Sequence, residues 1–322
     1  MFIRLLLIAA TLLGAQAAHA QQSVYPSRTA RMIVPFAAGG ASDTTARIVS
    51  QKLSERLGQQ FIVENRSGAG GTIGAAAVAK AAPDGYTLLM GSSTEIVTSP
   101  HIYKSVPYDV LRDFSSISFV ASQPLILAVH PSVPAKTVAE LITLAKSKPG
   151  ELNVASAGTG STLHLAQVLF ENAAQVKMTH VPFNGSPAAA TATLGNNTQV
   201  NFGTVPAVLE LVRSGQLRGL AVTGTKRIAA LPNLPTVSEA GLPGYDMVIW
   251  LALFGPAGLP ADIVGKLNAE VARILAAPDV RETFTKIGTD LAPDTPQSLT
   301  KYVADDWAKM KTIVEASGAK ID

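Results

Sequence analysis

The chain has 322 residues, no cysteine, a formal net charge of +3 and only 6% aromatic residues. Without cysteine it has no disulfide, no thiolate metal site and no cysteine nucleophile, and without runs of Lys or Arg it has no electrostatic footprint for nucleic acid or a membrane surface. Its length suffices to bury an apolar core, more readily as two domains than as one.

Residues 1–20 have the pattern of a secretory signal peptide. Arg4 supplies the positive start, residues 5–13 the apolar core, and Ala18-His19-Ala20 a small-x-small cleavage site. The alternative is a membrane anchor, but the apolar core has about half of the roughly 20 residues that a membrane-spanning helix needs. We therefore expect export to the periplasm and a mature chain that begins at Gln21.

Strands and helices alternate along the first half of the mature chain. Ser42 is expected to cap a helix that Gly58 ends, and an alanine-rich helix is expected at 72–82. The expected strands are 30–36, 61–64, 87–90, 117–120 and 125–129.

The second half repeats this alternation. Thr137 and Glu140 form a capping box that opens a helix reaching to Ser147. Pro260 and Pro296 each begin a later helix with one apolar face. The remaining expected strands are 152–155, 178–181, 200–202, 217–222 and 248–254, and the remaining expected helices are 162–173, 187–194 and 207–213.

This alternation predicts an α/β protein with largely parallel sheets covered on both faces. The chain has no low-complexity linker, so we expect two lobes joined by strands near 117–130 and 217–224. The first lobe would then be discontinuous, with residues 21–122 and 223–322, and the second would hold residues 123–222. Ligands of such sheets bind beyond the carboxyl ends of the strands.

Two stretches share one design: an apolar strand, a glycine-rich turn and a helix start with Ser. In the first, residues 32–36 lead into Gly39-Gly40 and Ser42, and in the second, residues 152–156 lead into Gly158-Thr159-Gly160-Ser161. A helix start presents unpaired N–H groups and the positive end of the macrodipole. The pair indicates two lobes that hold one anionic ligand between them.

Other chemistries fit these residues less well. The turns lack the glycine spacing of dinucleotide sites, and no Gly-Lys-Ser/Thr is present for a P-loop. Ser161 and His164 could serve as nucleophile and base, but the sequence offers no third group to orient the imidazole and no Gly-x-Ser-x-Gly elbow. The histidines lack metal-ligand spacing, so no cofactor or metal is expected.

The chain resembles the Bug family (Bordetella uptake gene products), the periplasmic solute-binding proteins of tripartite tricarboxylate transporters. The resemblance runs in order along essentially the whole mature chain, with departures at Ser99-Pro100, Phe183 and Glu95. The motifs that carry it are Val34-Pro35-Phe36-Ala37-Ala38-Gly39-Gly40 with Asp43 and Arg47, Glu64-Asn65-Arg66, Pro83-Asp84-Gly85-Tyr86, Ser156-Ala157-Gly158-Thr159-Gly160-Ser161 with His164, His180-Val181-Pro182-Phe183, and Gly255-Pro256-Ala257-Gly258.

The resemblance implies a type II periplasmic binding fold (a Venus flytrap) with two α/β lobes and two crossover strands. It implies a small carboxylate as the ligand, permease subunits as the partners, and a monomer that is not an enzyme. The implied ligand-binding residues are Phe36, Ala38, Gly39, Gly40, Ser42, Asp43, Ser92, Ser93, Thr94, Gly160, Ser161, Thr162 and His164, with Thr204 and Asp246 as further candidates. Two alternatives stay open: a binding protein that serves a sensor, and a secreted serine hydrolase that uses Ser161.

Overall fold

The computed structural model describes residues 25–317, so the predicted signal peptide lies outside the described residues. Three parallel strands begin this part of the chain. They are β1 (Ala30–Val34), β2 (Phe61–Asn65) and β3 (Thr87–Ser92), with β1 in the middle. The elements between and after them are α2 (Ala41–Leu57), the short turn η2 (Ala69–Gly71), α3 (Thr72–Ala79), the π-helical turn η3 (Thr94–Thr98) and α4 (Ser99–Ile102).

A single long strand, β4 (Phe114–Val129), joins the two halves of the molecule. Residues 114–124 of β4 pair antiparallel with β9 (Val248–Pro256). Residues 125–129 pair antiparallel with β7 (Val200–Thr204), and residues 126–129 with β8 (Arg218–Val222) on the other side. Two strands had been expected over this segment. The two expected strands form one continuous strand because residues 114–129 keep an extended backbone throughout, including at Pro124. At this residue the pairing changes from β9 to β7 and β8.

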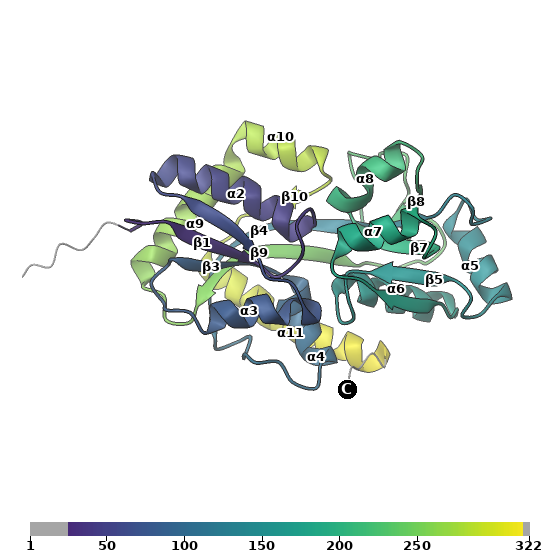
Figure 1. The fold of residues 1–322 in the computed structure, drawn as a ribbon, viewed down its shortest axis with the longest axis horizontal. Helices are drawn as coiled ribbons and strands as arrows, with labels where there is room; N and C mark the ends of the chain where they lie inside the picture. The colour runs from purple at the N-terminus through teal and green to yellow at the C-terminus, as the bar shows by residue number, and fades with distance from the viewer. Residues whose placement is uncertain (1–24, 318–322) are drawn as a thin grey trace, which may run out of the picture.

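The second half is a smaller α/β unit built on β4. Strand β5 (Asn153–Ser156) pairs parallel with β6 (Thr179–Pro182) and with β7. In Figure 1 this unit lies to the right, with α7 and α8 above its strands and α6 below. Its helices are α5 (Val138–Ser147), α6 (Thr162–Ala174), α7 (Ser186–Leu194) and α8 (Val205–Arg213).

The chain returns to the first half after β8, through residues 223–247. Thr223 holds this crossing: its N–H donates to the carbonyl of Leu125 at 3.0 Å, and its hydroxyl donates to the carbonyl of Met247 at 2.5 Å. Strand β9 then completes the first sheet between β3 and β4. The remaining elements are α9 (Ala261–Ala276), α10 (Pro278–Lys286), β10 (Asp290–Leu291) and α11 (Pro296–Ser317).

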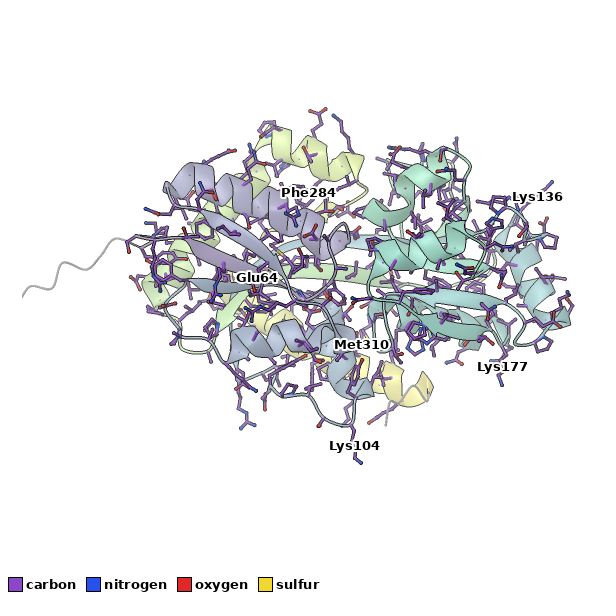
Figure 2. The ribbon with its side chains drawn as sticks, in the orientation of Figure 1. Glu64, Lys104, Lys136, Lys177, Phe284 and Met310 are labelled. Carbon is purple, nitrogen blue, oxygen red and sulfur yellow. The ribbon has the colours of Figure 1, made fainter. Side chains whose placement is uncertain are left out.

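Helices cover both faces of the first sheet. Figure 1 shows α2 and α10 above the strands and α3, α4 and α11 below them, with β4 and β9 running through the centre toward the second unit. Trp250 on β9 is buried and donates its indole N–H to Asp306 of α11 at 2.7 Å. Phe284 of α10 is fully buried (Figure 2), although the sequence had predicted no helix at 278–286.

The sheet is mixed rather than largely parallel. The strands within each lobe that precede helices are parallel, as expected, but every pairing of β4 and the β3–β9 pairing are antiparallel. Two neighbouring parallel strands are usually connected by a crossover helix. The strands that run between the lobes are not connected to their neighbours in this way, so they can pair antiparallel. Within residues 25–317, no helix is both long enough and apolar enough to span a membrane.

Candidate ligand-binding site

A small cavity lies between the two lobes. It encloses about 340 Å³ of empty space, part of it open to solvent. Its walls are Phe36, Ala37, Gly40, Ala41, Ser42 and Thr94 of the first lobe, Ala157, Ser161, Leu163, Ser186 and Thr204 of the second, and Ile249 of β9.

Four helix N-termini meet at this cavity. Helix α2 begins at Ala41, α6 follows its N-cap Ser161, α7 begins at Ser186, and α8 follows its N-cap Thr204. Only α6 has a side-chain cap, because the hydroxyl of Ser161 accepts from the backbone N–H of His164 at 3.2 Å. The starts of α2, α7 and α8 have no side-chain cap, so the N–H groups of their first turns stay available to an anion, except at Pro187 and Pro206, which have no N–H.

Among the described residues, no side chain that lines the cavity carries a charge. Polar contacts can come from the hydroxyls of Ser42, Thr94, Ser161, Ser186 and Thr204. Figure 2 shows Lys104, Lys136 and Lys177 pointing outward at the periphery of the molecule, away from its centre. The positive potential at the cavity therefore comes from helix macrodipoles and backbone N–H groups.

Asp43 organises the first-lobe turn. Its carboxylate accepts hydrogen bonds from the N–H of Gly39 and from Nε of Arg47, each at 2.9 Å, and from the amide of Asn65 at 3.0 Å. Burial alone would raise the pKa of Asp43, but these hydrogen bonds lower it below its usual value. With its oxygens occupied inside its own lobe, Asp43 holds the turn rather than facing the cavity.

The prediction that Ser42 caps α2 is wrong. Gly40 is the N-cap, with an extended backbone, and Ser42 lies one residue inside the helix. Gly40 already has the extended backbone of an N-cap, so the helix starts before the serine. Ser42 is nevertheless buried and lines the cavity.

Two stacked histidines support the second-lobe turn. The rings of His164 and His180 lie 3.9 Å apart and nearly parallel. Nδ1 of His164 accepts from the N–H of Gly160 at 3.3 Å, and Nε2 of His180 contacts the hydroxyl of Ser156 at 2.6 Å. Burial lowers the pKa of His164 to about 4, and burial together with the neighbouring His164 lowers that of His180 to about 3.

This geometry does not form a hydrolytic pair. The hydroxyl of Ser161 is engaged with the backbone of His164, while the imidazole of His164 contacts Gly160 and His180. Within residues 25–317, the imidazole of His164 therefore makes no hydrogen bond that could take the proton of this hydroxyl.

The two lobes touch along one side of the cavity. The hydroxyl of Thr94 lies 2.8 Å from that of Thr162, and Ser93 lies 3.2 Å from the same hydroxyl. Nearby, Ser99 donates to the carbonyl of Gly160 at 3.1 Å. These contacts connect the η3 segment of the first lobe to the start of α6, so the structure is in a closed conformation.

Glu95 lies behind this contact and is fully buried. Its carboxyl group contacts the hydroxyl of Ser92 at 2.6 Å and also accepts from the Ser92 N–H. Burial raises the pKa of Glu95 to about 8, although the hydrogen bonds of Ser92 oppose the shift. The side chain thus points into the first lobe and does not line the cavity.

The structure brings only part of the predicted set to the cavity. Phe36, Gly40, Ser42, Thr94, Ser161 and Thr204 line it. Ala38 and Gly39 are exposed on the first-lobe turn. Six more of the predicted residues make hydrogen bonds within one lobe or between the lobes, next to the cavity but not in its wall. They are Asp43, Ser92, Ser93, Gly160, Thr162 and His164.

Asp246 lies elsewhere. It is exposed and lines a separate groove on the hinge side, together with Lys226, Arg227 and Asp290. Ala37, Ala41 and Leu163, which lie within the implied contact stretches 36–43 and 160–164, also line the cavity. Sequence reasoning missed Ala157, Ser186 and Ile249, which line it as well. Ser186 had a usable signal, because Gly185-Ser186-Pro187 is typical of a helix start. Within the described part of the chain, no group of three or more His, Cys, Asp or Glu side chains could hold a metal ion.

A two-lobed α/β fold with helix N-termini around an interlobe cavity defines a periplasmic-type solute-binding protein. Residues 45–319 match the family described as "Tripartite tricarboxylate transporter family receptor", and the chain belongs to this family. The predicted fold class and the resemblance to Bug proteins are thereby confirmed, and the protein is a binding protein rather than an enzyme.

Relatives and solved structures agree with this assignment. Protein BugT of Bordetella pertussis is 36% identical over 306 residues, covering 95% of this chain and 94% of its own. Rpa4515 of R. palustris, solved with adipate, has a TM-score of 0.89 and 35% identity over 91% of this chain and 98% of its own. MatC of Rhodopseudomonas palustris, solved with bound malate, has a TM-score of 0.84 and 33% identity over 90% of this chain and all of its own (100%).

Proposed function

We propose that this protein captures a small carboxylate in its interlobe cavity, in the periplasm, and delivers it to the membrane permease of a tripartite tricarboxylate transporter. The family supports the transport role. The structural neighbours that hold adipate and malate support a carboxylate ligand.

The observation that carries the ligand class is the meeting of four helix N-termini at a cavity without charged side chains. Each helix start stabilises an anion by about 0.3–1 kcal/mol when exposed and up to ~2 kcal/mol when partly buried. Micromolar affinity requires about 8 kcal/mol. Hydrogen bonds from the lining hydroxyls, and burial of the ligand's carbon atoms against Phe36 and Ile249, supply the rest.

The residues of the proposed site have three roles. Those that line the cavity contact the ligand. Ser93, Thr162 and Gly160 close the lobes over it, while Asp43 and His164 hold the two turns in shape. We retain the proposed lobe boundaries, 21–122 with 223–322 and 123–222, export by residues 1–20, and action as a monomer.

Thermal unfolding of ligand-stripped protein tests the ligand class. Short mono-, di- and tricarboxylates should raise the melting temperature, while sugars and inorganic phosphate should not. A hundredfold excess of ligand over its dissociation constant stabilises the fold by about 2.7 kcal/mol. If only sugars or phosphate shift the transition, the carboxylate assignment is wrong.

Delivery to a permease is tested separately. The purified protein, loaded with a radiolabelled ligand found in that screen, should supply uptake into vesicles that contain its cognate permease subunits. Loaded protein that instead binds only a sensor domain, without uptake, would support the sensor alternative.

A further inference from the structure

Tyr103 lies in the first lobe, directly after α4, and its side chain reaches the second lobe. Its hydroxyl donates to the carbonyl of Thr159 at 3.0 Å. Its backbone is held in its own lobe, because its N–H donates to the carbonyl of Ser99 at 2.9 Å. Tyr103 is half-buried and is not one of the residues in the cavity wall. The hydrogen bond to Thr159 therefore joins the lobes beside the cavity.

The ring of Tyr103 lies between two glycines, one from each lobe. A Cβ added to Gly160 of the second lobe would lie 2.9 Å from Cε2 of the ring, and a Cβ added to Gly70 of the first lobe would lie 3.1 Å from the same atom. Both distances are shorter than the roughly 3.5–4.0 Å at which two carbon atoms make their best contact. The ring thus reaches the second-lobe turn because Gly160 has no side chain.

Two consecutive carbonyls of this turn (residues 158–160) accept hydrogen bonds from first-lobe hydroxyls. The carbonyl of Thr159 accepts from Tyr103 at 3.0 Å, and that of Gly160 accepts from Ser99 at 3.1 Å. Both bonds cross between the lobes, so they exist only while the lobes are closed.

The same two peptide units donate their N–H groups within the second lobe. The N–H of Gly160 donates to Nδ1 of His164 at 3.3 Å, and the N–H of Ser161 donates to the carbonyl of Gly158 at 3.1 Å. Ser161 is the N-cap of α6 and lines the cavity. Closure therefore completes the hydrogen bonding of the peptide units that place Ser161 at the cavity.

We propose that Tyr103 is a positioning residue for ligand binding, which holds the turn 158–160, and through it Ser161, in the closed conformation. An interaction made in one of two conformations shifts the equilibrium toward that conformation. Loss of the Tyr103 hydroxyl should therefore favour lobe opening and speed ligand release, without changing which carboxylates bind. This inference rests on the proposed function, since it assumes that the ligand leaves the cavity when the lobes part.

The first test needs no ligand and measures closure itself. The chain has no cysteine, so a Thr94→Cys, Thr162→Cys protein can form one intramolecular disulfide, which joins the two lobes. In ligand-free protein its rate of formation follows the fraction of closed molecules. Tyr103→Phe in this background should slow disulfide formation about three- to tenfold, because one hydroxyl-to-carbonyl hydrogen bond is lost from the closed conformation alone.

Tyr25→Phe in the same background is the matched control. The hydroxyl of Tyr25 also donates to a carbonyl, that of Gly85 at 2.8 Å, but both residues belong to the first lobe. Its removal should leave disulfide formation unchanged. The inference is overturned if Tyr103→Phe does not slow the reaction, or if Tyr25→Phe slows it equally.

A second pair of variants tests the ring contact from the other lobe. Gly160→Ala places a methyl group where the Tyr103 ring lies, so the ring and its hydroxyl must move and disulfide formation should slow. Gly150→Ala is the control, since Gly150 has the same φ of +79° and nothing within 4 Å of an added Cβ. Tyr103→Ala should remove the difference between Gly160→Ala and Gly150→Ala. Equal rates for the two alanine variants with Tyr103 present would overturn the ring contact as a closing contact.

The last test measures ligand release, with malate and adipate as the probes. In stopped-flow displacement, each probe that binds should leave Tyr103→Phe about three- to tenfold faster than it leaves the parent. The association rate, and the affinity ratio where both probes bind, should stay unchanged. An unchanged release rate, or a changed affinity ratio, would overturn the inference while leaving carboxylate binding intact. If neither probe binds, that result counts against the ligand class of the proposed function, and the ligand-free disulfide assay decides the role of Tyr103.

Discussion

Glu95 is a carboxyl group that the fold keeps in its neutral form. Its pKa is raised from 4.5 to about 8 by burial, so the folded protein binds one more proton than the unfolded chain between these values. Stability then falls as pH rises across this interval and stays low above it.

Replacing Glu95 by Gln tests this linkage. The variant cannot ionise, so its free energy of unfolding relative to that of the parent should increase steadily from pH 5 to pH 8, by more than 1 kcal/mol in total. Urea denaturation at several pH values measures the difference. A difference that does not vary with pH would show that Glu95 is not neutral in the fold.

Ser161 serves two roles that can be separated. Ser161→Ala should lose about 0.5–2 kcal/mol of stability as a missing cap, while Ser161→Gly should lose only a few tenths. Both variants should bind the ligand more weakly, because a hydrogen bond to a charged group is worth about 1.5–3 kcal/mol.

The matched control for Ser161 is Thr137, which caps α5 in the same way at 3.1 Å from the N–H of Glu140 and does not line the cavity. Thr137→Gly should leave ligand affinity unchanged. If calorimetry shows that Ser161→Gly binds as tightly as the parent, Ser161 is a cap alone.

Sequence patterns predicted the roles of some of these residues and not of others. The caps at Ser161 and Thr137 follow from serine or threonine placed just before an apolar helical pattern. Ser42 stands in a similar pattern, but Gly40 takes the extended N-cap conformation first. Ile249 gave no signal, since it reaches the cavity only because β9 pairs with β4, which lies more than 100 residues earlier in the chain.

At the scale of elements, the second-lobe turn depends on neutral histidines. The pKa values of His164 and His180, about 4 and about 3, lie below the usual value of 6.5. Between pH 6.5 and about pH 3, the unfolded chain therefore binds more protons than the folded protein. The associated stability is present above pH 6.5 and is lost as pH falls toward 4.

His180→Phe keeps a ring stacked on His164 but cannot take up a proton. Its stability should fall less steeply than that of the parent between pH 6.5 and pH 4, as followed by thermal unfolding. Ligand affinity should also weaken in this variant at every pH, because Ser156 loses its contact with Nε2. Parallel stability curves for the two proteins would contradict this account.

Element boundaries followed from the sequence where local chemistry sets them. Gly58 ends α2 with a left-handed backbone, as predicted. The continuity of β4 and the antiparallel pairings could not be predicted, because they depend on β9, which lies more than 100 residues later. Helix α10 was missed because only Val280 and Phe284 form its buried side, too few to show a helical period.

For the whole molecule, closure can be trapped chemically. The hydroxyls of Thr94 and Thr162 lie 2.8 Å apart across the lobes, and the chain contains no cysteine. A Thr94→Cys, Thr162→Cys protein should therefore form one disulfide on oxidation when ligand is present, holding the lobes closed.

Exchange of a radiolabelled ligand measures the effect. The oxidised protein should release ligand at least tenfold more slowly than the same protein after reduction, since dissociation requires the lobes to part. The reduced protein is the internal control. Equal release rates would mean that the ligand leaves without lobe opening.

The two-lobed plan was predictable because two similar glycine turns stand about one domain length apart. The meeting of four helix N-termini was not, since α7 and α8 reach the cavity only through the packing of the second lobe. The closed arrangement also had no sequence signal, because Thr94 and Thr162 look like ordinary polar residues at helix starts.

The N–H groups at the helix starts belong to the backbone, and this has a consequence for divergence within the family. Most amino-acid substitutions leave a main-chain donor in place, so mutation rarely removes the capacity to hold a carboxylate. The few side chains that line the cavity can be substituted while these backbone N–H donors stay the same. A single substitution can therefore change which carboxylate this fold binds, while the backbone continues to bind the carboxylate group itself.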